Sequence, residues 1–316
     1  MKLEQVHHVA IIGSGMIGAS MAALFTGNGY KTTIYAINDK EAQSGESRYD
    51  TYYKDLVNDG LVTPAQAAAC RALLHFTTTY DGIADADFIF ECVVERMDVK
   101  FEVFRQVEQH CKQFKAIASS TSAMSADDLA EGMTDKTKLL AAHPWNPPHL
   151  VPCVEIVRSN YTSDEALDFT VALLESVHRK PAIMKRSAPG FIANRLQHAI
   201  LREAVYMIEQ GICGPEDIDK ALTYSFIPRY TSIGFFQHQD YAGLDMVLSI
   251  DDYLFPDLCN ATKGQDYIRD RYNAGDLGVK TGKGIYDWHG VDMDAFRKRA
   301  SAPYLKFFDW DLPEGK

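Results

Sequence analysis

The chain of 316 residues is 46% hydrophobic and 24% charged, a composition typical of a soluble globular protein with room for two domains. A net charge of −11 and the lack of a long basic run argue against nucleic acid as a partner. No apolar stretch of the sequence is long enough to span a bilayer, so we expect no membrane partner either.

The first predicted element is a strand at Val9–Ile12 that leads into the glycine-rich run Gly13–Gly18, GSGMIG, and then into a helix. A GxGxxG pattern between a strand and a helix predicts a dinucleotide-binding turn. The first glycine permits the tight turn, the second lets the backbone approach a pyrophosphate, and the third lets helix and strand pack closely. Free N–H groups at the helix start would face the phosphates. The residues assigned to the cofactor are Gly13, Gly15, Met16, Ile17 and Gly18.

Strands and helices then alternate along the first half of the chain. Further strands are expected at Lys31–Ala36, His75–Thr78, Asp87–Cys92, Ala116–Ser119, Leu139–Ala142, Val154–Val157 and Pro181–Met184. Helices are expected up to Asn58, from Pro64, at Val99–Cys111, after Ser125 and at Asp164–Val177. The alternation predicts an α/β fold with a Rossmann-type, doubly wound, mainly parallel sheet and a ligand at the carboxyl ends of its strands.

The pattern changes at Lys185–Gly190, after which only helices are predicted. They are expected at Phe191–Gln210, Pro215–Leu222, Ala242–Ile250 and Asp266–Ala274. We therefore predict an NAD-binding Rossmann domain at 1–186 followed by an all-helical C-terminal domain at 187–316. The segment after Trp288 has a weak pattern, and the sequence assigns it no role.

The N-terminus and the cysteines indicate the compartment. The first strand begins close to Met1, which leaves no room for a signal peptide, so we expect a cytoplasmic protein. The cysteines are scattered without a CxxC pair, and we interpret them as reduced thiols and predict no metal site. They are Cys70, Cys92, Cys111, Cys153, Cys213 and Cys259.

Polar side chains with catalytic potential follow the later strands. Ser122 ends the run SSTS, His143 opens HPWNPP, Glu155 lies in the next strand, and Asn194 lies in GFIANR. A histidine can take the proton of an alcohol while the carbon-bound hydrogen leaves as hydride to a nicotinamide. A neighbouring carboxylate can orient the imidazole and stabilise its protonated form. These residues predict an alcohol-oxidising site.

The same motifs resemble the L-3-hydroxyacyl-CoA dehydrogenase family, in the same order and spacing across nearly the whole chain. The matching stretches are Gly13–Gly18, Glu95 with Lys100, SSTS at 119–122, HPWNPP at 143–148, Glu155, GFIANR at 190–195 and KTGKGIYDW at 280–288. The resemblance implies that His143 is the general base, that Glu155 is its partner, and that Ser122 and Asn194 contact the substrate oxygen.

The resemblance also implies cofactor contacts and an assembly. It places Glu95 and Lys100 near the nicotinamide and its ribose, and Asn146 is assigned to cofactor binding as well. The family's second domain is helical and usually dimerises, so we expect a homodimer through residues 187–316. Ser122 alternatively caps the helix that follows it.

The position after the second strand departs from the pattern for NAD. An acid that binds the adenosine ribose is expected there, but the residue is Ala36. Asp39, three residues further on, can reach back to the ribose, or Asn38 can take the place of the missing acid. Alternatively the site accepts the 2′-phosphate of NADP, with Lys40 or Arg48 nearby. We favour NAD, because no arginine follows the strand directly.

Two observations favour a small free hydroxy carboxylate as substrate. Residues 39–60, which should lie beside the acyl-CoA entrance, hold three basic and six acidic side chains, a net charge of −3 that would repel coenzyme A phosphates. Arg229 lies in IPRYTSIG, which resembles the RYxxIG stretch of the lambda-crystallin and L-gulonate 3-dehydrogenase branch. An arginine can hold a carboxylate through two parallel hydrogen bonds.

Two other functions remain open. One is an L-3-hydroxyacyl-CoA dehydrogenase of fatty-acid metabolism. The other is a non-catalytic, crystallin-like protein that keeps the fold and the cofactor, although the intact pair of His143 and Glu155 argues against lost catalysis.

Overall fold

The computed structural model describes residues 3–315, which form two compact units. The first unit comprises residues 1–192 and 297–316, and the second comprises residues 193–296. The sequence assigned residues 297–316 to the second domain, but the structure groups them with the first unit. The reason is packing: Trp310 is buried in the first unit's core, beside Tyr53 and over Gly27. The exact domain boundaries stay a prediction.

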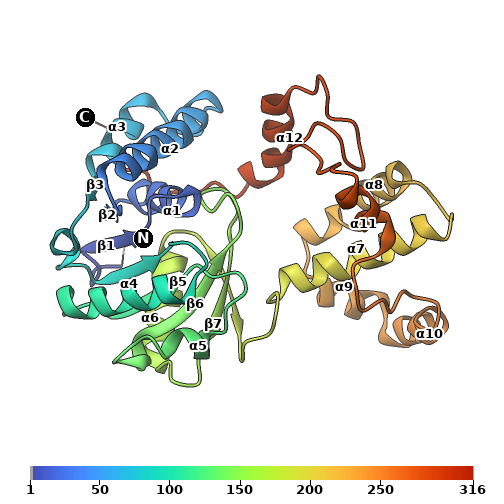
Figure 1. The fold of residues 1–316 in the computed structure, drawn as a ribbon, viewed down its shortest axis with the longest axis horizontal. Helices are drawn as coiled ribbons and strands as arrows, with labels where there is room; N and C mark the ends of the chain where they lie inside the picture. Colours follow the sequence, from blue (N-terminus) through green and yellow to red (C-terminus); the bar gives the residue numbers. More distant parts are fainter. Residues whose placement is uncertain (1–2, 316) are drawn as a thin grey trace. The chain divides into compact units, whose positions relative to one another are not determined.

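An eight-stranded sheet has the strand order β3-β2-β1-β4-β5-β6-β7-β8. Figure 1 shows this sheet at the centre of the first unit. The strands are β1 (His8–Ile12), β2 (Lys31–Tyr35), β3 (Leu74–Thr77), β4 (Phe88–Glu91), β5 (Ala116–Ser119), β6 (Leu139–Pro144), β7 (Cys153–Arg158) and β8 (Lys180–Met184). Every pairing is parallel except that of β6 with β7. The predicted Rossmann-type, mainly parallel sheet is confirmed.

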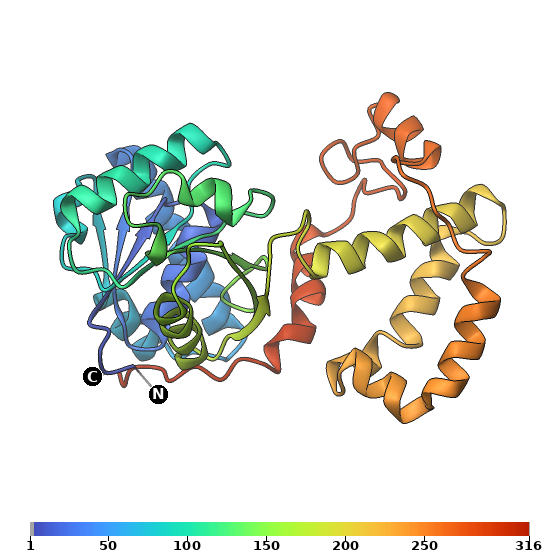
Figure 2. The ribbon, with the colours of Figure 1, turned by 90° about the horizontal axis from the view of Figure 1, so that it is seen from below.

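Helices cover both faces of this sheet (Figure 2). They are α1 (Met16–Gly27), α2 (Asp39–Asn58), α3 (Pro64–Ala72), α4 (Met97–His110), α5 (Ala126–Ala130) and α6 (Asp164–Ser176), with short 3-10 turns η1 (Tyr80–Ile83) and η2 (Lys136–Lys138). Apolar residues of α1, α2 and α6 form one core, and those of α4 and α5 form the other. Val9–Ile12 of β1 are all apolar, because both faces of this buried strand are covered by helices.

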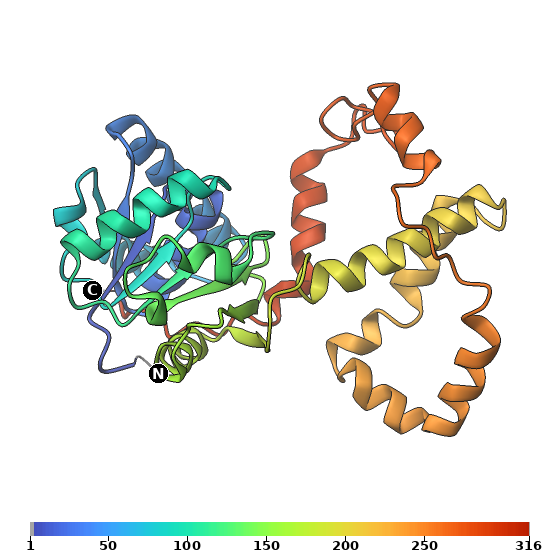
Figure 3. The same ribbon diagram turned by 60° about the horizontal axis from the view of Figure 1, so that its bottom comes forward.

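The second unit is helical. It contains α7 (Ala193–Glu209), α8 (Pro215–Tyr224), η3 (Pro228–Thr231), α9 (Phe235–Ala242), α10 (Leu244–Leu254) and α11 (Asp266–Asn273), while α12 (Met293–Leu305) leads back to the first unit. In Figure 3, α8, α9 and α10 follow one another along a curved path after α7. Among the described residues of this unit, Val205 alone is buried and hydrophobic. This unit thus lacks a hydrophobic core of its own.

Candidate functional site

The glycine turn between β1 and α1 has three glycines with different constraints. A Cβ on Gly13, whose φ is +113°, would lie 2.6 Å from the carbonyl oxygen of Cys92. A Cβ on Gly18 would lie 1.9 Å from the carbonyl oxygen of Gly13. A Cβ on Gly15 meets nothing within 4 Å, so the space in front of the helix start is open. The turn therefore leaves room for a pyrophosphate where a dinucleotide fold requires it.

Apolar side chains are exposed at the same edge of the sheet. Met16 is 59% exposed at the start of α1, Ile37 is 75% exposed after β2, and Val94 is 62% exposed after β4. Large apolar side chains in one place on a surface are typical of a ligand site. Together with the open glycine turn, they fit the planar rings of a dinucleotide.

The residues after β2 carry two acids and one base, because exposed Lys40 lies between Asp39 and Glu41. Ala36 is buried, and Asn38 caps α2 by accepting the N–H of Glu41. Asp39 and Glu41 both lie in the first turn of that helix. Arg48 is turned away toward the carbonyl oxygen of Ser14 and the hydroxyl of Ser44, with donor–acceptor distances of 3.3 and 2.7 Å.

A buried ion pair lies at the carboxyl ends of β4 and β5. Lys100 of α4 donates to both carboxylate oxygens of Glu91, at 2.9 and 2.8 Å, and neither side chain is exposed. Ser119 also donates to Glu91, at 2.5 Å. The pair holds the ammonium of Lys100 rigidly beneath the loop after β4. Sequence reasoning missed Glu91, although an acid that ends an apolar strand next to a predicted site is an identifiable signal.

Glu95 joins this cluster from the loop after β4. Its carboxylate lies 3.3 Å from the ammonium of Lys100 and accepts from the hydroxyl of Thr121 and the N–H of Ser122. Partial burial opposes ionisation, but the Thr121 hydrogen bond and the Lys100 charge outweigh it and lower the pKa of Glu95. Glu95 thus contacts both Lys100 and the main chain of Ser122, which brings together three residues that the family resemblance assigns to the nicotinamide and the substrate. The helix α5 is capped by Ser125 and not by Ser122, which leaves the hydroxyl of Ser122 without that structural role.

His143 and Glu155 form a pair across the antiparallel strands β6 and β7. The two residues are directly opposite in the strand register, and Nδ1 of His143 lies 2.9 Å from Oε2 of Glu155. A carboxylate can only accept, so Nδ1 carries the hydrogen and Nε2 is left free to take a proton. Glu155 is fully buried, whereas His143 is partly exposed.

Three further groups contact this pair and were missed from the sequence. The indole N–H of Trp145 donates to Oε2 of Glu155 at 3.1 Å, and the main-chain N–H of Ile192 donates to Oε1 at 2.7 Å. The ring of Phe191 packs against His143 at a centroid distance of 5.5 Å. Backbone donors carry no sequence signature, so Ile192 could not have been found without a structure.

The remaining predicted residues are placed as follows. Asn146 is exposed in the loop after β6 and is joined to Pro147 by a cis peptide bond. Asn194 and Arg229 belong to the second unit, where Asn194 lies at the start of α7 and Arg229 in η3. Arg229 is exposed and contacts His238.

Within residues 3–315, no group of three or more histidine, cysteine, aspartate or glutamate side chains is placed to hold a metal ion. Within the same residues, no helix has the length and apolarity needed to traverse a bilayer.

Comparison with known proteins agrees with the site. Residues 8–187 match the family model of the 3-hydroxyacyl-CoA dehydrogenase NAD-binding domain, and residues 190–288 match that of the C-terminal domain. L-carnitine dehydrogenase of Nocardiopsis dassonvillei is 34% identical over 70% of this chain and 66% of its own length. 5-Formyl-3-hydroxy-2-methylpyridine 4-carboxylate 5-dehydrogenase of Mesorhizobium japonicum is 28% identical over 89% of this chain and 90% of its own length.

Solved structures give the same result. A crystal structure of a 5-dehydrogenase acting on that pyridine carboxylic acid, described as an NAD⁺-dependent dismutase, superposes with a TM-score of 0.85. It is 26% identical, and the alignment covers 96% of this chain and 97% of the other. The chain therefore belongs to the 3-hydroxyacyl-CoA dehydrogenase family and is an oxidoreductase with that family's NAD-binding domain, acting on CH–OH groups.

Proposed function

We propose that this enzyme oxidises the secondary hydroxyl of a small, free hydroxy carboxylate to a ketone, with His143 as the general base. The observation that carries the proposal is the His143–Glu155 pair, whose buried carboxylate fixes Nδ1 and leaves Nε2 free. Nε2 takes the hydroxyl proton, and the negative charge of Glu155 stabilises the imidazolium that results. The bound nicotinamide supplies the hydride acceptor.

Other residues are proposed to orient the reactants. Ser122 and Asn194 would hydrogen-bond the substrate oxygen, which would align the hydroxyl with Nε2 of His143. Glu95, Lys100 and Asn146 would contact the nicotinamide and its ribose. The cluster of Glu91, Glu95 and Lys100 supports this role, because its mutual hydrogen bonds fix each charged group in place before a ligand arrives.

We propose NAD rather than NADP as the cofactor. The 2′-phosphate of NADP would approach the end of β2, where Asp39, Lys40 and Glu41 begin α2 with two acids against one base, a net charge of −1. Repulsion between like charges opposes that approach, and Arg48 is engaged with Ser14 and Ser44. The ribose hydroxyls of NAD carry no charge and suffer no such penalty.

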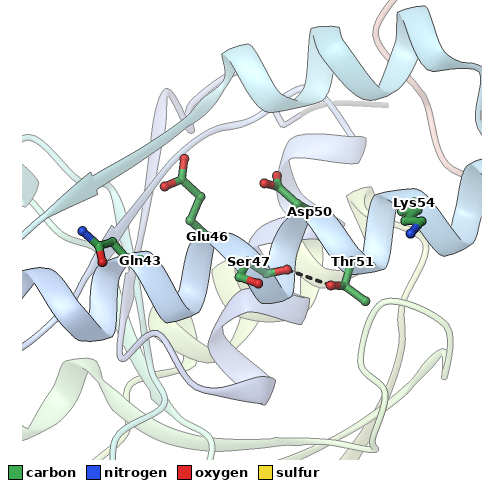
Figure 4. A pocket seen from close by; sticks show the side chains of 6 residues that line it. All are labelled: Gln43, Glu46, Ser47, Asp50, Thr51 and Lys54. Carbon is green, nitrogen blue, oxygen red and sulfur yellow. Dashed lines mark hydrogen bonds between the residues drawn. The ribbon is translucent and has the colours of Figure 1, made fainter.

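The acidic residues within 39–60 support a free hydroxy acid as the substrate, but more weakly than the sequence alone indicated. Figure 4 shows a hollow on α2 lined by Gln43, Glu46, Ser47, Asp50, Thr51 and Lys54. Arg71 of α3 contacts both Glu46 and Asp50, and Lys298 pairs with Asp59. These pairs neutralise part of the net charge of −3, so the repulsion of coenzyme A by this helix is reduced.

Arg229 is the stronger support for a carboxylate substrate. Within residues 3–315, no carboxylate lies at ion-pair distance from it; its guanidinium contacts His238 instead. A structural salt bridge is therefore not its role in the described part of the chain. Two of the relatives are named for carnitine and for a pyridine carboxylate, neither of which is an acyl-CoA. L-3-hydroxyacyl-CoA oxidation in fatty-acid metabolism is the alternative.

A substrate panel tests the proposal. We would compare kcat/KM for acetoacetyl-CoA reduction with that for oxidation of 3-hydroxybutyrate, gulonate, carnitine and aromatic or sulfonated hydroxy acids. Arg229→Met should lower kcat/KM for the preferred free acid at least about 30-fold, or roughly 2 kcal/mol, by removal of a charge-assisted hydrogen bond. Exposed Arg202→Met is the control and should have no effect. Efficient turnover of acetoacetyl-CoA that Arg229→Met leaves intact would restore the acyl-CoA function.

We also propose a homodimer formed through the second unit, in the cytoplasm. The second unit exposes large apolar side chains on several helices, among them Leu196, Phe235, Phe236, Leu244, Leu248 and Tyr253. Monomeric proteins rarely expose so many large apolar side chains in one unit, and a second copy of this chain would cover them. The cysteines are all free thiols, which fits a reducing compartment.

A further inference from the structure

The carboxylate of Glu155 is shared between several donors. Oε2 accepts from Nδ1 of His143 at 2.9 Å and from the indole N–H of Trp145 at 3.1 Å. Oε1 accepts from the main-chain N–H of Ile192 at 2.7 Å. Because Glu155 is buried, each of these hydrogen bonds restrains its carboxylate and stabilises part of its negative charge. How strongly the carboxylate stabilises a positive charge on His143 therefore depends on the other donors.

One of these donors belongs to the connector, by which we mean Gly190–Ile192, the last residues of the first unit before α7. Gly190 and Phe191 both have positive φ, of +77° and +50°. Phenylalanine rarely adopts this left-handed conformation, so packing must hold it there. The ring of Phe191 is buried and lies 5.5 Å from that of His143. The connector thus covers the imidazole with one residue and binds its partner carboxylate with the next.

We propose that Trp145 and the connector are positioning residues for the catalytic pair, which set the orientation of Glu155 and how strongly it stabilises protonated His143. The inference rests on the proposed role of His143, but the imidazole can be observed directly without substrate. It also links the segment that leads into the second unit to the basicity of the catalytic histidine.

The direction of the effect follows from the geometry. Removing the indole N–H leaves more negative charge on Oε2 for His143, so the imidazolium is favoured and His143 titrates at higher pH. The described contacts of His143 come from Glu155, Trp145 and Phe191. Cys153, on the same strand as Glu155, has its pKa raised by burial and by Glu155 and stays neutral.

The test is an NMR titration of the full chain with ¹³C-labelled histidine, in which the His143 resonance is identified by its loss in His143→Ala. Trp145→Phe and Trp145→Leu both lack the donor and should both raise the titration midpoint. Trp310→Phe is the matched control, because the buried indole nitrogen of Trp310 has no partner within residues 3–315. It should leave the midpoint unchanged. A midpoint that neither Trp145 variant moves would overturn the role of Trp145, even if the enzyme is active.

The connector has its own matched pair of variants. Gly190→Ala places a Cβ at a φ of +77° and should displace the N–H of Ile192 from Glu155, which again raises the midpoint. Gly29→Ala imposes the same backbone strain at a φ of +79°, where the Cβ meets nothing within 4 Å. Both variants should lower the Tm similarly, but only Gly190→Ala should move the His143 titration. Equal titration curves for the two variants would show that the connector is structural only. Failure of the proposed function would instead show as normal turnover in His143→Ala.

Discussion

At the residue scale, the three glycines of the first turn differ in whether the fold or the ligand requires them. Gly13 and Gly18 have no space for a Cβ because backbone atoms lie within 3 Å of its position, whereas Gly15 has open space. Gly15 also has a φ of −68°, which any residue adopts. The sequence motif predicted this division, with the first and third glycines serving the fold and the second serving the ligand, and the space around each glycine agrees with it.

Gly15→Val should therefore fold normally and lose cofactor. We expect NAD⁺ affinity to fall at least about tenfold, or roughly 1.4 kcal/mol, because the branched side chain occupies the pyrophosphate position. Calorimetric titration measures the affinity, and thermal unfolding without cofactor should give a Tm close to that of the parent. Gly18→Val, by contrast, should lower the Tm strongly through its clash with Gly13. Equal affinity for parent and Gly15→Val would contradict the location of the cofactor.

At the element scale, the strongest local patterns gave the most accurate predictions. The strand and helix around the glycine turn were located correctly, as was the pair of His143 and Glu155 on neighbouring strands. Helices α9 and α12 were missed, because their apolar residues do not repeat at helical spacing toward one covered face. The donors to Glu155 were missed because Trp145 lies in an irregular loop and Ile192 acts through its backbone.

The loop between β6 and β7 is held by buried side chains. His149 is buried, and its Nδ1 accepts from the hydroxyl of Ser20, which in turn accepts the N–H of His149. Arg179 donates to the carbonyl oxygens of Pro148 and Val151. Burial, with a smaller contribution from the charge of Arg179, lowers the pKa of His149 to about 3.

This burial makes the stability of the loop depend on pH. In the unfolded chain the pKa of His149 is near its ordinary value of about 6.5. Below that pH the unfolded state therefore binds a proton at His149, whereas the folded state leaves the imidazole neutral. His149 thus costs nothing above pH 6.5 and opposes folding increasingly between pH 6.5 and 3, by at most about 1.4 kcal/mol per pH unit. His149→Gln should lose less stability than the parent between pH 7 and pH 5.

Chemical denaturation at each pH measures this difference. Exposed His75→Gln is the control and should follow the parent. Parallel pH dependence of the parent and His149→Gln would show that the histidine is not kept neutral by burial.

At the scale of the whole molecule, the two units differ in how they bury apolar surface. The first unit has two cores on the faces of its sheet, and Trp310 of the C-terminal segment completes one of them. The second unit has almost no buried apolar side chains of its own. The sequence predicted an all-helical unit and most of its helices, but helical periodicity does not reveal whether an apolar stripe faces the same chain or another.

A homodimer should therefore be the state of this protein in solution at micromolar concentration. Light scattering should give twice the chain mass of 35.4 kDa. Leu248→Glu or Phe236→Glu on the exposed faces of α10 and α9 should shift the mass toward one chain, because a buried charge opposes association. Ile183→Glu, at an exposed position of β8 in the first unit, is the control. One chain mass for the parent would contradict the dimer.

The catalytic role of His143 is the centre of the proposed function, and His143→Ala tests it most directly. We would measure NAD⁺-dependent oxidation of the best hydroxy acid in the panel together with the Kd for NAD⁺, in parent and variant. Loss of a positioned general base should lower kcat by about 10²–10⁴-fold. The Kd for NAD⁺ should stay within about twofold, a change below roughly 0.4 kcal/mol. The reason is that β4 and β5 separate β6, which carries His143, from β1, which leads into the glycine turn. Near-normal turnover in His143→Ala would contradict the assignment of His143 as the base.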